Sequence, residues 1–545
     1  MSPTPLHKML GQIRPLQKIR PLLAEGFWLL ILLAVAFGAF TWNRDSVFFG
    51  REIYYLDGDC YSRMTRVQML EEGGLRAIRH HAWENFPEGT RPHTTMPLDA
   101  LILGLSRILG VFSERPLELA GAWISPLLGA GMILFLAWWS AVLCLPYRRA
   151  VTAMVAVSPI VAHGFQVGRP DHQSLLMVLM AVALAAEVGM LLRRQAGSRG
   201  DARQHTPPWG YVAAGAWGLA LWVSLFEPLV LLGVVWALRG TEFLWRRAKG
   251  ESTKSWHASR GPGVVFCAIL ATGLLVDGWR AAGFHPAFAR WALNIGELQG
   301  AGWHGIFSWC GWLIAVGPGF LLWRGLRGGG SVCGWWLVLV LVVSGLSFYH
   351  SRWGYFLALV FAMSLPWALS ALRRPWLAWS VFVISLWPVA AEWDRVLFPD
   401  VATTLRRAEN LSDAVALREA ALSLRGMPHA GVVAPWWFSP AIVWWSGQPC
   451  VGGTSHQSLP GILDSCGFYL ASDPALAGEV LRRLGAGYVF AYEPARVVSN
   501  SEQILGRAQS GRTLAKILYD QPNAAPVGWE IIFKNQFFRV YRVPF

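Results

Sequence analysis

The sequence has few charged residues for its length and lacks paired cysteine motifs. Only 15% of the 545 residues are Asp, Glu, Lys or Arg, whereas soluble domains contain about a quarter. The seven cysteines show none of the CxxC spacings that zinc or redox sites use. In contrast, 54% of the residues are hydrophobic, 31 are Trp, and the mean hydropathy is +0.38. We therefore expect a polytopic membrane protein without thiol chemistry.

Eleven apolar runs are candidates for membrane-spanning helices, each of which needs about 20 apolar residues. They cover residues 26–42, 120–145, 150–162, 175–192, 211–226, 229–245, 263–279, 303–323, 332–348, 353–372 and 376–391. The run over 150–162 is short, and the run over 229–245 contains Arg239 and Glu242. A further amphipathic stretch, 98–109, is too short to span the bilayer and is predicted to lie along its surface.

Basic residues recur in alternate loops, which is typical of the cytoplasmic loops of membrane proteins. They are Lys8, Arg14, Lys18, Arg20, Arg148, Arg149, Arg193, Arg194, Arg246, Lys249, Arg324, Arg327, Arg373 and Arg374. This pattern accounts for the net charge of +14 without a nucleic-acid partner. We predict a cytoplasmic segment over 1–25, a transmembrane domain over 26–391 with a long first outer loop over 43–119, and an extracytoplasmic domain over 392–545. The expected location is a bacterial inner or plasma membrane, with the last domain in the periplasm.

The last part of the chain has a different pattern. Short runs rich in β-branched and aromatic residues cover 430–434, 486–491, 529–533 and 537–543. They alternate with helical patterns over 405–424 and 473–484, which indicates a compact α/β domain. Cys450 and Cys466 lie on this oxidising side, so a disulfide between them is one possibility.

The predicted outer loops contain a distinctive set of acids. Asp57 and Asp59 occur in the first loop, Asp171 in the second and Glu297 in the third. Carboxylates that meet at a dry boundary repel each other unless a cation neutralises them, and their oxygens suit Mg²⁺ or Mn²⁺. Such an ion, together with Arg352, would neutralise the phosphate of a lipid-linked sugar as the glycosidic bond breaks. These residues favour a glycosyltransferase.

Each of these residues also has a simpler interpretation. Asp57 or Asp59 could cap a helix, because Asp is a common N-cap. Asp171 and Glu297 could be solvated loop acids, and Arg352 could extend to the membrane interface. The acids in or beside the apolar runs are also expected to reach the interface, since each lies near a predicted helix end: Glu187, Glu227, Glu242 and Asp277.

Several motifs in order along the chain resemble those of the catalytic subunit of oligosaccharyltransferase and its single-subunit bacterial and archaeal relatives. They are Asp57-Gly58-Asp59-Cys60-Tyr61 with Arg66, Trp83 to Thr90 with Pro97 and Leu98, Gly168 to Gln173, Asn294 to Glu297, Ser351-Arg352-Trp353, and Gly431 to Trp437 with Trp445 to Pro449. The resemblance covers nearly the whole chain. It implies a C-type membrane glycosyltransferase fold, inversion at the anomeric carbon and a polyprenyl-linked glycan donor.

The resemblance also implies roles for individual residues. Asp59 matches the first-loop aspartate that binds the metal ion, Mn²⁺ or Mg²⁺, and polarises the acceptor amide. Asp171 matches a second metal ligand, and Gln173 stands where relatives have a stronger one. Glu297 matches a glutamate that contacts both metal and acceptor, and Arg352 matches the arginine that binds the donor phosphate.

The sequence departs from the family at the acceptor site. In relatives, a Trp-Trp-Asp triplet recognises the hydroxyl of the Asn-x-Ser/Thr acceptor, and here Trp436 and Trp437 are followed by Phe438. Without the carboxylate, that hydroxyl loses a charged hydrogen bond worth about 1.5–3 kcal/mol. Trp436 and Trp437 could therefore bind the acceptor or be core aromatics. The acceptor could be another peptide, a hydroxyl group, or another lipid or glycan.

Two other functions stay open on the sequence alone. A related C-type enzyme would transfer a single sugar from a polyprenyl monophosphate to lipid or protein. A lipid-glycan flippase or transporter is a candidate from another class, but transporters place charged groups at the midplane and show internal repeats. The acids of this chain instead lie in predicted outer loops.

Overall fold

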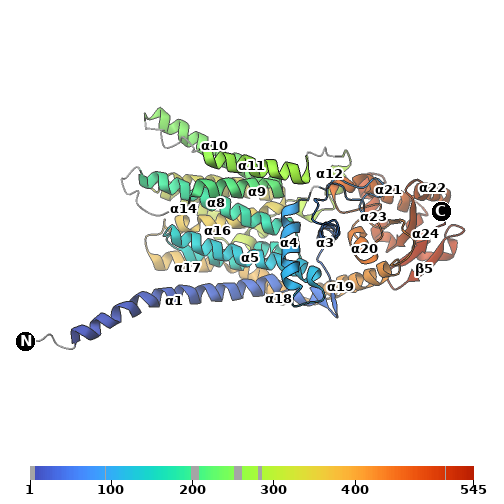
Figure 1. Ribbon diagram of the computed structural model, residues 1–545, viewed down its shortest axis with the longest axis horizontal. Helices are drawn as coiled ribbons and strands as arrows, with labels where there is room; N and C mark the ends of the chain where they lie inside the picture. The colour runs from blue at the N-terminus through green and yellow to red at the C-terminus, as the bar shows by residue number, and fades with distance from the viewer. Residues whose placement is uncertain are drawn as a thin grey trace, which may run out of the picture.

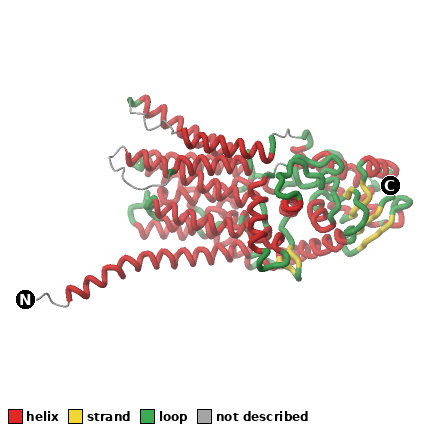
Figure 2. Tube along the Cα trace, in the orientation of Figure 1, coloured by secondary structure: helices red, strands yellow, loops and turns green. Residues whose placement is uncertain are grey.

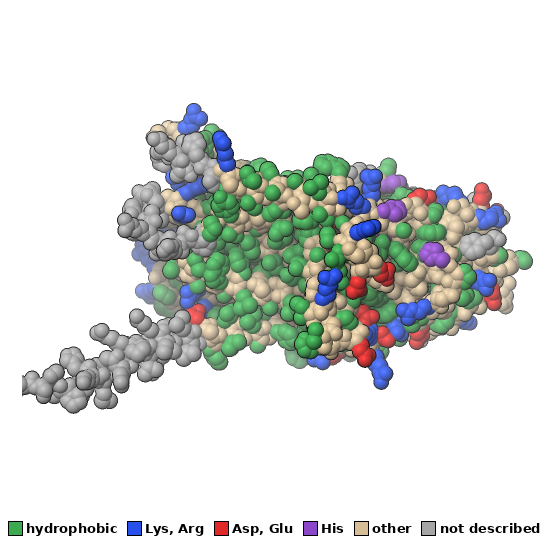
Figure 3. All heavy atoms as spheres, in the orientation of Figure 1, with side chains coloured by type: hydrophobic (Ala, Val, Ile, Leu, Met, Phe, Trp, Pro, Cys, Tyr) green, Lys and Arg blue, Asp and Glu red, His purple; other side chains and the backbone are tan. Residues whose placement is uncertain are grey.

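The computed structural model describes residues 6–92, 94–197, 208–250, 260–279, 285–509 and 511–544. A long bundle of helices continues at one end into a smaller part made of helices and strands, which includes the C-terminus (Figure 1, Figure 2). Apolar side chains cover most of the visible face of the bundle (Figure 3). Most acidic side chains on this face lie at the junction with the smaller part or beyond it (Figure 3). A broad apolar surface of this kind is typical of contact with lipid.

Eight helical segments are long and apolar enough to cross a membrane within the described ranges. They lie in α1 (Leu6–Thr41), α5 (Pro116–Val142), α8 (His172–Gly197), α10 (Phe226–Ala248), α11 (Arg260–Asp277), α15 (Ser331–Tyr349), η3 with α16 (Ser351–Trp353 and Gly354–Leu369), and α17 with α18 (Pro375–Ser385 and Trp387–Leu397). A ninth span is formed if α13 (Trp303–Cys310) and α14 (Leu313–Leu326), which meet at 72°, are counted as one broken helix. The chain is thus an integral membrane protein.

The prediction of eleven spans is wrong in number. The run over 211–226 forms α9 (Trp209–Val223), whose 15 residues are short for a bilayer. The run over 150–162 divides into α6 (Arg148–Val157) and α7 (Pro159–Gly164). Pro159 keeps the preceding Ser158 extended, at φ −66° and ψ 121°, so the first helix ends there. Apolar composition located these helices but did not determine their length.

The first outer loop folds against the end of the bundle. Its elements are α2 (Arg44–Val47), an antiparallel pair of β1 (Phe48–Phe49) and β2 (Glu52–Ile53), α3 (Gly58–Glu72) and α4 (Met96–Leu109). α4 lies across the end of the bundle, in agreement with the predicted surface stretch over 98–109 (Figure 1). The buried Asp99 of α4 forms ion pairs with two residues of α3, with Arg63 at 2.7 Å and with Arg66 at 2.8 Å. These pairs hold the two helices together.

The C-terminal part contains a four-stranded mixed sheet, as the alternating sequence pattern predicts. Its strands are β3 (Gly431–Val433), β4 (Ala486–Ala491), β5 (Glu530–Lys534) and β6 (Arg539–Arg542), in the order β3-β4-β6-β5. β3 and β4 are parallel, and the other neighbouring pairs are antiparallel. The helices are α19 (Val401–Leu422), α20 (Ser439–Ser446), α21 (Leu459–Leu470), α22 (Pro474–Arg483), α23 (Pro494–Leu505) and α24 (Leu514–Asp520).

The first outer loop is bound directly to the C-terminal part. The amide of Phe86 donates to the carbonyl of Cys450 at 3.1 Å, and the amide of Cys450 donates to the carbonyl of Trp83 at 3.0 Å. The amide of Gly461 donates to the side chain of Asn85 at 2.8 Å. Cys450 and Cys466 are both buried and free, so the possible disulfide is not formed. These hydrogen bonds hold the first outer loop against the C-terminal part.

Candidate functional site

The start of α3 determines the position of Asp59. Asp57 is the N-cap of this helix, and its carboxylate accepts the amide hydrogen of Cys60 at 3.0 Å. Asp59 is therefore a first-turn residue and not the cap. Gly58 lies so close to the C-terminal part that an added Cβ would be 2.6 Å from Cγ2 of Thr454. A larger residue at this position would separate the helix from Thr454, so Asp59 faces the interface between the two parts.

Three other carboxylates are near enough to affect the charge of Asp59. Burial raises the pKa of Asp59, the charges of Asp57, Asp171 and Glu297 add to the increase, and a hydrogen bond from Thr454 opposes it, so that the pKa is about 7. The four acids come from three separate loops, so their mutual repulsion arises only in the folded chain. Asp59 consequently changes its charge close to neutral pH.

Asp171 has the opposite environment. It immediately precedes α8, where its carboxylate lies 2.7 Å from Nδ1 of His172 and 3.7 Å from the guanidinium of Arg169. Burial opposes its ionisation, but His172 and Arg169 together hold the pKa of Asp171 well below its ordinary value. Arg169 also lies 3.2 Å from the carboxylate of Asp57. Asp171 is therefore a permanent, paired anion.

The other two predicted ligands, Gln173 and Glu297, differ in their surroundings. Gln173 is 1% exposed, and within the described residues neither its amide oxygen nor its amide nitrogen has a hydrogen-bond partner. Glu297 lies in a short turn, η2 (Gly296–Leu298). Burial raises the pKa of Glu297, against the opposing charge of Arg352, and the charge of Asp171 adds to the increase.

Arg352 is oriented by an acid that the sequence did not indicate. Its guanidinium lies 2.6 Å from the carboxylate of Glu227, which is 0% exposed and accepts the hydroxyl of Ser224 at 2.8 Å. The expectation that Glu227 reaches the membrane interface is therefore wrong. The amide of Ser351 donates to the carbonyl of Gln299 at 2.7 Å, which keeps Arg352 next to the loop of Glu297. The only sequence signal for Glu227 was its place at the start of an apolar helix.

Trp436 contacts the loop that contains Glu297. Its indole N–H donates to Asn500 at 2.9 Å, and Asn500 donates to Asn294 at 2.8 Å. Its ring also packs against Trp291 of α12 (Phe288–Ala292), with 5.9 Å between the ring centroids. Trp436 thus links the C-terminal part to the third outer loop.

Trp437 and Phe438 have different surroundings. The buried indole N–H of Trp437 has no hydrogen-bond partner among the described residues, and the guanidinium of Arg496 lies 5.6 Å from its ring. Phe438 packs edge-on against Tyr492 and Phe538, with ring centroids 4.9 and 5.3 Å apart. The position that holds an Asp in the family pattern is therefore part of an aromatic core.

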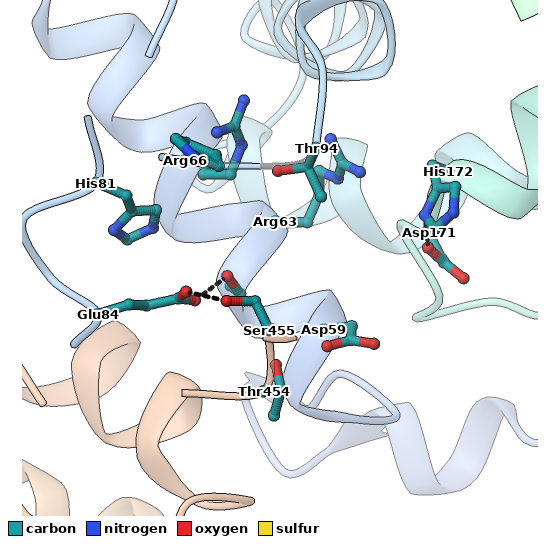
Figure 4. Close-up of a pocket in the computed structure, with 12 residues that line it drawn as sticks. Asp59, Arg63, Arg66, His81, Glu84, Thr94, Asp171, His172, Thr454 and Ser455 are labelled. Atoms are coloured by element: carbon teal, nitrogen blue, oxygen red, sulfur yellow. Dashed lines mark hydrogen bonds and ion pairs between the residues drawn. The ribbon is translucent and has the colours of Figure 1, made fainter. Parts of the chain in front are cut away.

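A polar pocket brings part of this set together (Figure 4). It contains about 450 Å³ of empty space, part of it open to solvent, and is lined by Asp59, Ser62, Arg63, Arg66, His81, Glu84, Pro92, Thr94, Asp171, His172, Thr454 and Ser455. Of the predicted site residues, Asp59 and Asp171 line it. Gln173, Glu297, Arg352, Trp436 and Trp437 lie outside its lining. Sequence reasoning missed His81, Thr454 and Ser455, because their approach depends on contacts between distant segments.

Solved structures share the fold of this chain. No protein-family profile and no curated protein matches the sequence. The solved structure of the archaeal oligosaccharyltransferase AglB from Archaeoglobus fulgidus, in complex with an inhibitory peptide and a dolichol-phosphate, is similar with a TM-score of 0.63. That alignment has 13% sequence identity and covers 89% of this chain and 71% of AglB. The motif resemblance is thus confirmed for the fold.

Two further structures agree. AglB from the same organism, tethered to an acceptor peptide that contains the NVT sequon, gives a TM-score of 0.59 at 14% identity and covers 89% of this chain and 71% of that one. ArnT from Cupriavidus metallidurans in the apo state gives a TM-score of 0.50 at 14% identity and covers 94% of this chain and 97% of ArnT. Similarity at this identity establishes the fold alone, so activity has to be argued from the site.

Proposed function

We propose that the protein is a membrane glycosyltransferase that transfers a glycan from a polyprenyl-(pyro)phosphate donor to an acceptor on the outer side of the membrane. The observation that supports it is the shared pocket of Asp59 and Asp171, whose carboxylates have opposite pKa shifts. Sites that push the pKa values of two acids apart are typical of catalysis. In this proposal the ionised Asp59 accepts a hydrogen bond from the acceptor nucleophile and orients it for attack, together with Glu297.

Arg352 is the residue that we assign to the donor phosphate. Its contact with the fully buried Glu227 fixes one edge of the guanidinium, and an arginine binds phosphate through several N–H groups at once. Its positive charge would oppose the negative charge that develops on the leaving phosphate. Attack from the opposite side of the sugar would invert the anomeric carbon.

The site contains oxygen atoms of the kind that bind a divalent cation. Asp59, Asp171, Gln173 and Glu297 offer only oxygen ligands, which suit Mg²⁺ or Mn²⁺, and the amide of Gln173 is buried without a partner in the described structure. Among the described residues, no three His, Cys, Asp or Glu side chains are close enough to share an ion. We propose that these four residues would hold one ion, which would supply Lewis-acid stabilisation of the phosphate.

We propose a broader range of acceptors for this protein than the sequon peptide found in the AglB structure. One of the AglB structures contains a peptide with the NVT sequon, but here Phe438 packs against Tyr492 and Phe538 where the family pattern has an Asp. Trp436 and Trp437 are proposed to contact the acceptor through their apolar faces. We propose an acceptor that needs no charged partner at this position: a different peptide, a hydroxyl group, or a lipid or glycan.

A single-sugar transfer from a polyprenyl monophosphate is the second candidate. The observation that favours it is the missing Asp at Phe438, since such an enzyme has no need to recognise a sequon. Mass spectrometry of the lipid donor that co-purifies with the chain separates the two: an oligosaccharide pyrophosphate supports the first candidate and a monosaccharide phosphate the second.

The test of the proposed function compares membranes that contain the wild-type chain, Asp59→Ala or Glu297→Ala. Mass spectrometry of proteins, lipids and glycans would show products in the wild type and their loss in both variants. Glu88→Ala is the matched control, because Glu88 is an exposed acid of the same outer loop. Undiminished transfer by either test variant would remove the proposal.

A further inference from the structure

The end of the pocket beyond Asp59 contains buried hydrogen-bond donors without acceptors. Arg66 and His81 line this end and are 1% and 2% exposed. Within the described chain, Nε and Nη1 of Arg66 and Nε2 of His81 have no hydrogen-bond partner. A buried N–H group without an acceptor is unfavourable, so this arrangement indicates that a ligand or ordered water completes it.

The local contacts determine that His81 is a donor. Its Nδ1 accepts the amide hydrogen of Trp83 at 3.3 Å. A neutral imidazole has one donor and one acceptor nitrogen, so the proton is on Nε2. Burial lowers the pKa of His81, which keeps the ring neutral. The unpartnered Nε2–H of His81 and the unpartnered N–H groups of Arg66 therefore both require an oxygen acceptor.

The same end offers an acceptor as well. One oxygen of Glu84 accepts the hydroxyl of Ser62, and the other accepts the hydroxyls of Ser455 and Ser458, each at 3.3 Å. A carboxylate has about four acceptor positions, so Glu84 can accept one more hydrogen bond. Glu84 of the first outer loop and Ser455 of the C-terminal part are in contact at this end of the pocket (Figure 4).

The formal charges at this end balance. Arg63 and Arg66 are positive, and Asp99, which pairs with both, is negative, as is Glu84. An anion or a cation would disturb this balance. A group that both accepts and donates hydrogen bonds without charge would satisfy Arg66, His81 and Glu84 together, and the ring hydroxyls of a sugar do this.

We propose that this end of the pocket is a subsite for one uncharged sugar ring, bound through Arg66, His81 and Glu84. The assignment rests on the proposed function and deepens it, because the pocket is continuous with Asp59 and a ring here would be next to the reacting centre. The pocket contains about 450 Å³ of empty space, part of which is open to solvent.

The test is saturation-transfer NMR on the detergent-solubilised full chain, with methyl β-glucoside, methyl β-N-acetylglucosaminide and inorganic phosphate as separate probes. We expect at least one sugar to bind the wild type and the Asp59→Ala variant. The affinity should decrease at least tenfold in His81→Phe and in Glu84→Gln. His80→Phe and Glu88→Gln are matched controls at exposed neighbouring positions and should bind the sugar like the wild type.

Three results would overturn the subsite. They are binding of neither sugar to the wild type, equal sugar binding by the His81 and Glu84 variants and the wild type, and preferential binding of phosphate. A folded state of each variant is checked by its thermal unfolding midpoint. Glycan transfer could depend on Asp59 while the KM for the donor is the same in the wild type and in the His81 and Glu84 variants. In that case the subsite fails and the proposed function stands. If sugar binding follows the prediction in a chain that transfers nothing, the proposed function fails while the subsite stands.

Discussion

Asp59 and Asp171 line the same pocket but belong to regions with opposite electrostatics. Asp59, at the start of α3, has three carboxylates near it and one hydroxyl hydrogen bond, from Thr454. Asp171, before α8, has a histidine and an arginine against its oxygens. The pKa of Asp59 is raised to about 7, and that of Asp171 is lowered.

Because their environments differ, the two aspartates are suited to different tasks. Asp171 is charged at every physiological pH and already neutralised by its neighbours, so it is suited to organise the site. Asp59 is held in a state of electrostatic strain that a cation or an acceptor hydrogen would relieve. Changes at Asp59 and at Asp171 should therefore have different effects.

The largest expected effect is on activity, from Asp59→Asn. The rate of glycan transfer should decrease at least about 100-fold, as for the loss of one electrostatic contact in a transition state. The variant should be at least as stable as the wild type in EDTA, since a repelled carboxylate is removed. Transfer assays in vesicles and thermal unfolding in detergent measure the two quantities. Asp45→Asn, at an exposed site in the same loop, is the control; a lower unfolding midpoint for Asp59→Asn would contradict the contrast.

Asp171→Asn should lower the stability of the protein. It leaves the buried Arg169 with one acid fewer, and breaking a buried ion pair costs about 3–5 kcal/mol of the free energy of unfolding. Because the folded pKa is depressed, this stabilisation is present above the ordinary Asp pKa and is lost as the pH falls below it. Thermal unfolding at neutral pH should show a clearly lower midpoint than for Asp59→Asn. Equal midpoints would show that the two environments do not differ.

The third effect is a pH dependence of transfer. Since ionised Asp59 is the active form, the rate should increase as the pH rises through about 7 and fall about tenfold for each unit below it. For stability the sign is opposite: the folded pKa exceeds the unfolded one, so the contribution of Asp59 is lost as the pH rises from about 4 to 7. A transfer rate that does not vary between pH 5.5 and 8 would exclude Asp59 as the titrating group.

A divalent cation should shift that profile. Mn²⁺ or Mg²⁺ near Asp59 favours its ionised form, so the midpoint should move about one pH unit or more to lower values and return on addition of EDTA. Ca²⁺, which prefers longer distances to more ligands, serves as the comparison ion. Identical profiles with EDTA and with Mn²⁺ would remove the proposed metal site.

The smallest effect is expected from Thr454→Val. Loss of one hydrogen bond to the ionised carboxylate is worth about 1 kcal/mol, which moves the midpoint of the pH profile up by about 0.7 unit. Thr94→Val is the matched control on another wall of the pocket. Its pH midpoint should equal that of the wild type. An unchanged midpoint for Thr454→Val would mean that the hydroxyl does not act on Asp59.

Local sequence patterns predicted several features that depend only on nearby residues. The cap by Asp57 follows from the conformational preference of Asp before a helix, and the four strands of the C-terminal sheet follow from short β-rich runs. The number of spans was overestimated because the proline break at Ser158 and Pro159 and the length of α9 are not visible in apolar composition. The role of Glu227 was missed because its partner, Arg352, is 125 positions away in the chain.

The sequence by itself determined that this is a polytopic membrane protein with a mixed α/β part after it, because composition and periodicity act over short distances. The order of its motifs also indicated the C-type fold. Only the tertiary structure decided which acid is strained and which is paired, since Coulomb energies depend on distances between loops that are remote in the chain. It also decided that Glu84 meets Ser455 and Ser458, a contact for which no local pattern selects.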